Sequence, residues 1–315
     1  MRTKTRTKKE TRPTLSWFLL ILANILWACS YVAAKYALRD ISVFMMNALR
    51  MILAAIVLLP FLILMRKDLK LTRRDLPQLA LLAFIGLVIN KTFEFDGLSL
   101  STASDVALLI TSETIYTAVL SWLLLRERFK PLTGIALLLG IAGVYLIVER
   151  SVIPNIPAGG GIMRMVGDLM VVLALILEAF YTVRGKALLV KHSPLLITAA
   201  TIVGSTIFWI PIAGGDILFN GWHPLSLAAW LGVGWLALMS TIIAYFAWFK
   251  GLAVVDGSAA ASTLFVQPLL GTVLAIILLH DQLLPTTIVG GILIIASVYL
   301  ISRSSRVPAR DTPTI

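Results

Sequence analysis

Charged residues are scarce in this chain of 315 residues: Asp, Glu, Lys and Arg make up 14% of it, while hydrophobic residues make up 59%. Soluble domains average about 25% charged and about 45–50% apolar residues. A soluble fold could not bury this much apolar surface, so the composition predicts a protein whose solvent is a lipid bilayer. The only cysteine, Cys29, excludes an intramolecular disulfide.

Sequence motifs of the common enzyme classes are also missing. The chain has no His-Glu-x-x-His, Gly-x-Ser-x-Gly or Walker A sequence. Without an ATP-binding loop, the chain cannot itself drive primary pumping. His192, His223 and His280 are far apart in the sequence and near predicted helix ends, so they do not predict a metal site. We therefore expect no enzymatic activity, no catalytic residue, no cofactor and no bound metal.

Long apolar runs dominate what remains. Ten of them, bounded by charge, proline or glycine, lie at 15–37, 42–65, 76–96, 99–125, 131–149, 167–190, 194–214, 226–250, 254–279 and 284–302. Their length and continuity predict membrane-spanning α-helices, because barrel strands alternate between apolar and polar residues over about ten residues. The expected fold class is an all-α integral membrane protein with ten transmembrane helices.

Lysine and arginine cluster in the two terminal tails and in every second loop, on one side of the ten predicted spans. By the positive-inside rule, this side is the cytoplasm. We expect a multi-pass protein of the cytoplasmic (inner) membrane whose tails, 1–14 and 303–315, are both cytoplasmic. The net charge of +11 therefore comes from basic residues in the predicted cytoplasmic loops and tails, and no nucleic-acid partner is expected. The run from residue 15 to 38 is too long for a cleaved signal peptide.

The two halves of the chain match each other. The sequence Val-Tyr-Leu-Ile at 144–147 recurs at 298–301, and acids, prolines and glycines align at the same offset. Because each half holds five spans, an odd number, the second half must be inverted in the membrane. Inverted repeats are a transporter architecture with a solute site near the midplane. We expect repeats at 15–149 and 167–302, joined by an external linker at 150–166.

Short pieces in a fixed order across both halves resemble the EamA family of the drug/metabolite transporter superfamily. They are residues 27–35 (WACSYVAAK), 47–50 (NALR), 121–128 (SWLLLRER), 167–169 (GDL), 244–248 (AYFAW) and 267–268 (QP). The resemblance implies ten helices in two inverted five-helix repeats and a central cavity lined by helices such as the first, third, fourth, sixth, eighth and ninth. It also implies transport, commonly export, of small metabolites such as amino acids. The chain departs from the family pattern at Thr114, where proline is common, and at Asp281, which replaces Glu.

Charged residues inside an apolar span cost about 2.5–3.5 kcal/mol at the bilayer centre and mark candidate sites. Glu113 and Glu178 lie inside the fourth and sixth predicted spans. Either acid could bind a solute ammonium, and Glu113 could take up a coupling proton; the alternative is a structural acid bonded to Ser or Thr. Lys91 and Glu94 are three residues apart, so they could form a local salt bridge, an outer gate or a solute contact.

Aromatic and polar residues on the helices that the resemblance assigns to the cavity complete the candidate solute-binding set. They are Trp27, Tyr31, Tyr116, Tyr181, Tyr245, Trp248 and Gln267. Packing or an interfacial belt is the alternative for each aromatic residue. Lys35 and Arg50 are placed toward the external side, where we expect them to neutralise carboxylates or to snorkel.

These candidates contain more acids than the one deep base, Lys91, which favours amine-bearing or zwitterionic solutes. We therefore expect a secondary transporter or facilitator that works by alternating access and exports amino acids or related amines, with proton coupling through Glu113 as a further hypothesis. The expected partners are a small solute and the bilayer; the oligomeric state is left open. The alternatives are an intramembrane enzyme, which would need paired catalytic groups at one depth, and a receptor or scaffold, in which the cavity acids would be dispensable.

Overall fold

The computed structural model describes residues 13–65, 72, 75–125, 131–149, 161–189, 191–222, 224–254, 260, 262–281 and 285–305. Every extended regular element within these ranges is a helix. In chain order they are α1 (Pro13–Ala37), α2 (Val43–Met65), α3 (Leu76–Phe84), η1 (Ile85–Ile89), α4 (Asn90–Leu100), α5 (Ala103–Ile110), α6 (Glu113–Leu125), α7 (Pro131–Glu149), α8 (Ile162–Leu188), α9 (Pro194–Asn220), α10 (Leu227–Trp235), η3 (Leu236–Ile243), α11 (Ala244–Leu252), η4 (Ser262–Phe265), α13 (Val266–Leu279) and α14 (Pro285–Ser305).

Six helical segments within the described residues are long and apolar enough to cross a bilayer. They are 14–37, 43–64, 76–100, 162–188, 194–220 and 227–252, and three shorter apolar helices lie at 134–147, 266–279 and 285–300. Large apolar side chains cover the outside of the bundle; Leu64 and Leu218, for example, are more than four-fifths exposed. Such a surface is stable only against lipid.

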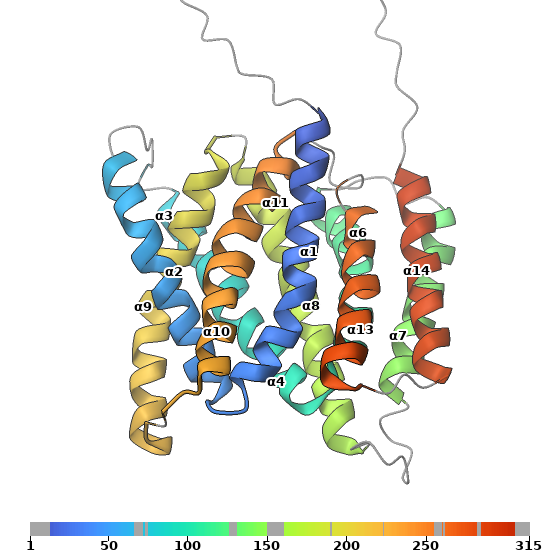
Figure 1. Ribbon diagram of the computed structural model, residues 1–315. Coiled ribbons are helices and arrows are strands. Elements are labelled where there is room, and N and C mark those ends of the chain that lie inside the picture. The colour runs from blue at the N-terminus through green and yellow to red at the C-terminus, as the bar shows by residue number, and fades with distance from the viewer. Residues whose placement is uncertain are drawn as a thin grey trace, which may run out of the picture.

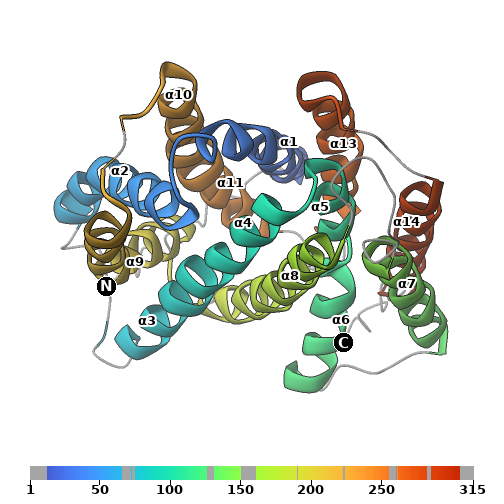
Figure 2. The same cartoon turned by 90° about the horizontal axis from the view of Figure 1, so that it is seen from below.

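The helices stand side by side in one bundle, and the first residue of α1 lies at the same end as the last residue of α14 (Figure 1). Viewed from the end, the pair α7 and α14 forms one edge of the bundle and the pair α2 and α9 the opposite edge (Figure 2). Between these pairs, α4 packs on α8, α1 packs on α11 and α13, and α5 packs on α13. The interior therefore lies among α1, α4, α5, α8, α11 and α13.

Two spans contain a π-helical segment in the middle: η1 joins α3 to α4, and η3 joins α10 to α11. A π segment disturbs the regular hydrogen-bond ladder and frees carbonyl groups for other donors. Both segments use this opening in the same way. The indole Nε1 of Trp209 donates to the Leu87 carbonyl in η1, and that of Trp27 donates to the Ser240 carbonyl in η3, each over 3.0 Å.

Glycine allows the closest helix contact near the interior. A Cβ on Gly97 of α4 would lie 2.5 Å from the Gly167 carbonyl oxygen of α8, and a Cβ on Gly167 would lie 2.8 Å from the Gly97 carbonyl oxygen. Only residues without a side chain let two backbones approach so closely in a membrane bundle. This contact presses α4, which carries Lys91 and Glu94, against α8, which carries Glu178.

The apolar runs locate the helices well but miss their interruptions. The run 99–125 contains α5 and α6, separated by a turn at 111–112, and the run 254–279 contains a 3-10 turn, η4, at the start of α13. Helix α8 begins at Ile162, inside the expected linker, and α14 continues to Ser305. Residues 150–160 of the linker and most of both tails lie outside the described residues.

Candidate functional site

A cavity lies in the interior of the bundle. The empty space between its lining atoms, including open solvent, is about 550 Å³. Its lining residues come from α1, α2, α4, α5, α6, α8, η3, α11 and α13. They are Trp27, Ser30, Tyr31, Arg50, Asn90, Lys91, Glu94, Phe95, Ile110, Glu113, Leu175, Glu178, Thr182, Ser240, Tyr245, Trp248 and Gln267.

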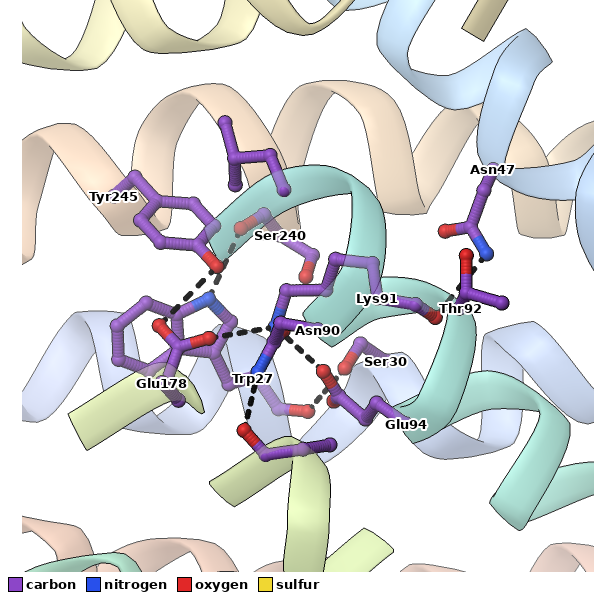
Figure 3. A network of polar contacts seen from close by, with 12 residues as sticks. Trp27, Ser30, Asn47, Asn90, Lys91, Thr92, Glu94, Glu178, Ser240 and Tyr245 are labelled. Carbon is purple, nitrogen blue, oxygen red and sulfur yellow. Dashed lines mark hydrogen bonds and ion pairs between the residues drawn. The ribbon is translucent and has the colours of Figure 1, made fainter. Parts of the chain in front are cut away.

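An ionic cluster joins α4, α8 and α11 across this cavity (Figure 3). The Lys91 ammonium lies 2.5 Å from the Glu94 carboxylate and 3.1 Å from the Glu178 carboxylate. The Tyr245 hydroxyl donates to the other oxygen of Glu178 over 3.4 Å. The pairing of Lys91 with Glu94 is the expected one, but it is a buried, three-member cluster and not a salt bridge at the membrane interface.

Two further ionisable side chains line the cavity outside this cluster. Arg50 is 1% exposed, and its Nε and Nη1 atoms have no hydrogen-bond partner. The guanidinium carbon lies 5.0 Å from the centre of the Phe95 ring. Glu113 is buried beside Thr182, and no ion pair joins it to another described residue. The cavity thus contains three carboxylates and two cations.

The position of Arg50 corrects a sequence-based expectation. Arg50 is the eighth residue of α2, and the sequence predicts that it either neutralises carboxylates or snorkels to the external surface. The snorkelling alternative is wrong, because the side chain is buried and faces α4 and the cavity. The other alternative agrees with the attraction between Arg50 and the Glu94 and Glu178 carboxylates. Lys91 is therefore not the only deep base, and the excess of acids falls to one.

Aromatic side chains form one wall of the cavity. The Trp27 ring lies 5.4 Å from Tyr245 and 5.5 Å from Trp248, measured between ring centres, and the contact with Tyr245 is edge-on. The hydrogen bond from Trp27 to Ser240 fixes the indole against the π segment η3. Stacking of this kind makes a rigid apolar surface, suited to hold the non-ionic part of a solute.

A polar contact between α1 and α13 orients Gln267. Its side-chain amide donates to the Asn24 Oδ1 atom over 2.7 Å, and the Asn24 amide donates in turn to Thr263 over 2.9 Å. All three side chains are buried. Gln267 therefore presents a fixed, uncharged polar group to the cavity.

All the candidate residues except Tyr116 and Tyr181 line this cavity. Tyr181 lies behind Tyr245, with its hydroxyl 3.2 Å from the Thr201 hydroxyl. Tyr116 packs against an apolar cluster around α5. Sequence reasoning missed five polar residues that line the cavity, which are Ser30, Arg50, Asn90, Thr182 and Ser240. For Arg50 the signal was available, since it is a charge within an apolar helix.

A second buried ionic cluster lies where α1 ends and α8 begins. Arg164 forms an ion pair with Asp105 and also donates to the Thr102 hydroxyl over 3.2 Å. The Thr287 hydroxyl donates to the second oxygen of Asp105 over 3.3 Å. This end cluster, defined as Arg164, Asp105, Thr102 and Thr287, links the first turns of α5, α8 and α14.

Metal binding finds no support in the part of the chain that the structure describes, where no group of three His, Cys, Asp or Glu side chains could hold an ion. Glu94 and Glu178 are ion-paired with Lys91, and Glu113 forms no ion pair with another described residue. The charged groups of the three acids and two cations all line this cavity.

The sequence model of the EamA-like transporter family matches residues 14–149 and 165–303. The chain belongs to the EamA-like transporter family. The family resemblance drawn from the sequence is thus confirmed, and this EamA protein is a multi-pass membrane protein of a transporter family.

Similar proteins agree with this assignment. An uncharacterized transporter of Archaeoglobus fulgidus is 28% identical over 90% of this chain and 95% of its own length. A probable terminal-alkyne amino-acid exporter of Streptantibioticus cattleyicolor is 24% identical over 94% of this chain and 96% of its own length. One crystal structure shares the fold with a TM-score of 0.64 and 19% identity, over 92% of this chain and 98% of the other.

Proposed function

We propose that this EamA protein is a secondary transporter or facilitator that moves amine-bearing or zwitterionic solutes, with amino acids as the first class, through alternating access. The observation that carries the proposal is the buried cavity in which Glu113 lacks an ion partner among the described residues beside an already paired cluster. A carboxylate that is desolvated and unpaired is stabilised by a cationic group that enters from outside. The similarity to a probable amino-acid exporter supports the same solute class and the export direction.

Two inverted five-span repeats are part of the proposal, and the helix contacts support them. The ten spans are α1, α2, α3–α4, α5–α6, α7, α8, α9, α10–α11, η4–α13 and α14. Exchanging each span with the one five places later turns the α4–α8 contact into the α11–α1 contact. The same exchange leaves the pairs α2–α9, α5–α13 and α7–α14 unchanged. A bundle built from two copies of one unit has this property.

Local irregularities recur at equivalent places in the two halves and support the repeats further. The π segments η1 and η3 lie in the third span of each half. The fourth spans are both interrupted, at 111–112 and at the junction of η4 with α13. The close approach of Gly97 to Gly167 has its counterpart in Gly251, whose Cβ would lie 3.1 Å from the Ser16 carbonyl oxygen.

Inverted repeats explain how such a protein works without ATP. Each half can adopt the conformation of the other, so that states open to either side of the membrane have similar energies. In the proposed topology both tails lie in the cytoplasm, which fits the common end of α1 and α14 (Figure 1). The end cluster around Arg164 then lies on the external side of the inner membrane.

Proton coupling through Glu113 is the most specific part of the proposal. The purified protein in proteoliposomes should exchange amino acids at a rate that depends on pH, and the residual exchange by Glu113→Gln at saturating solute should not depend on pH. Asp96→Asn is the matched control, because Asp96 is an acid of α4 that does not line the cavity. A Glu113→Gln variant with the wild-type pH dependence eliminates Glu113 as the proton site, and solute binding without any flux favours a receptor instead.

A further inference from the structure

We propose that Arg50 binds an anionic oxygen group of the solute, so that the transported molecule is a zwitterion and not a simple amine. The inference rests on the proposed function and narrows its solute class. It assigns a binding role to a residue that lies outside the paired cluster and deep in the second span.

No side chain in the described ranges forms a hydrogen bond or ion pair with Arg50, although the Glu94 and Glu178 carboxylates attract its charge from further away. The side chain is 1% exposed and lines the cavity. Its Nε and Nη1 donors are buried without acceptors. The ring face of Phe95, 5.0 Å from the guanidinium carbon, holds the group in place but accepts none of its hydrogen bonds.

The carboxylates nearby are already committed. Lys91 contacts both Glu94 and Glu178, and Tyr245 donates to Glu178 as well. The cavity contains five carboxylate and cationic groups. Lys91, Glu94 and Glu178 neutralise one another in part, which leaves Arg50 and Glu113 without a direct ion pair. The cavity thus contains one cation and one acid that form no ion pair within the described residues.

A buried guanidinium without a partner is costly, and replacing it with an apolar or neutral side chain would relieve that cost. Its planar group with five N–H donors matches a carboxylate or another anionic oxygen group better than any other ligand chemistry. A solute with an ammonium group for Glu113 and an anionic oxygen group for Arg50 would complete both sets of contacts. Amino acids have both groups on one small molecule.

The test uses thermal unfolding of the detergent-purified full chain with three matched probe sets: the L-amino acids, the amines that result from their decarboxylation, and the carboxylic acids that lack their amino group. A ligand that binds only the folded state raises the unfolding temperature. We expect amino acids to stabilise the wild type at concentrations at least about tenfold lower than the matched amines, and Arg50→Gln to remove this difference. Arg39→Gln, at the exposed end of α1, is the control and should behave like the wild type.

The stability of the unliganded variants separates binding from a structural role. Without solute, Arg50→Gln should unfold at the same temperature as the wild type or higher, because it removes an unpaired buried charge. Arg50→Lys keeps the charge but loses the planar donor set, so it should fold and bind amino acids about tenfold more weakly while binding amines unchanged. A lower unfolding temperature for Arg50→Gln together with wild-type binding by Arg50→Lys would assign Arg50 to structure and overturn the inference.

The remaining outcomes distinguish this inference from the proposed function. Equal stabilisation of wild type and Arg50→Gln by amino acids and by amines overturns the role of Arg50 and leaves the transport of amines standing. Stabilisation of the wild type but not of Arg50→Gln by carboxylic acids alone upholds Arg50 and overturns the amine requirement. If no compound of the three sets stabilises the wild type, both proposals fail.

Discussion

The two buried ionic clusters of this protein differ in one respect that separates structure from function. In the end cluster, Arg164 and Asp105 neutralise each other, and hydroxyl groups occupy the remaining positions around them. In the cavity, Arg50 and Glu113 are also buried, but neither forms an ion pair with another described residue. A satisfied cluster holds helices together, whereas an incomplete one is stabilised only by what enters it. Helices α5 and α8 supply residues to the end cluster and to the lining of the cavity.

The largest effect on this comparison is expected from breaking the end cluster. Asp105→Asn leaves the buried Arg164 charge uncompensated, which should lower the free energy of unfolding by about 3–5 kcal/mol. Unfolding of the purified protein by heat or denaturant measures the loss. The double variant Asp105→Asn with Arg164→Gln should recover most of it, and residual folded protein of either variant should bind solute as the wild type does. A change in solute preference would mean that this cluster also contacts the solute.

A second prediction is that removing an acid from the cavity, unlike breaking the end cluster, does not lower stability. Glu113→Gln removes a buried unpaired acid, so it should leave the unfolding temperature unchanged or raise it, while solute affinity falls about 10- to 100-fold through loss of a charged hydrogen bond. Thermal unfolding with and without an amino acid measures both quantities on one sample. A strong loss of stability without solute would place Glu113 with the structural acids.

The contact between Gly97 and Gly167 predicts a smaller effect, on both stability and solute binding. Because a Cβ at Gly97 would meet the Gly167 carbonyl oxygen at 2.5 Å, Gly97→Ala should separate α4 from α8 and cost about 1–3 kcal/mol of stability. Solute binding should weaken as well, since Lys91 and Glu178 lie on these two helices. Gly214→Ala is the control, because a Cβ there meets no atom within 4 Å. Equal stability of the two variants would contradict the close contact between α4 and α8 at Gly97 and Gly167.

The smallest effect is expected from the hydroxyl at the edge of the cavity. Tyr245→Phe removes a 3.4 Å hydrogen bond to Glu178, which is worth about 1 kcal/mol or less. Solute affinity should therefore change by less than about tenfold. Tyr181→Phe, whose hydroxyl faces Thr201 outside the cavity, should leave affinity unchanged, and flux assays on both variants would show whether the cavity boundary lies between these two tyrosines.

The sequence predicts the membrane spans and several cavity residues for a simple reason. An apolar run of span length has few alternatives to a helix, and a charge inside it, such as Glu113, Glu178 or Lys91, must face protein or water. Which face a residue occupies is harder to infer, because helical phase is lost wherever a span is irregular. Tyr116 follows the interruption at 111–112 and turns away from the cavity.

Arg50 and the end cluster show two other limits. The position of Arg50 along α2 does not determine its burial, because burial depends on the neighbouring helix, and Phe95 of α4 covers the guanidinium. Arg164 and Asp105 are 59 residues apart in the sequence. No local pattern joins them, so their pairing follows only from how α5 and α8 pack.

The central claim, that the two unpaired charges of the cavity bind and move a zwitterion, is tested most directly by counterflow of a labelled L-amino acid into proteoliposomes preloaded with the same amino acid. The account predicts saturable accumulation with the wild-type protein for at least one amino acid, little competition from its decarboxylated amine, and accumulation below about one tenth of wild type in Glu113→Gln and in Arg50→Gln. Equal accumulation in both variants and the wild type, or none with any amino acid in the wild type, would contradict it.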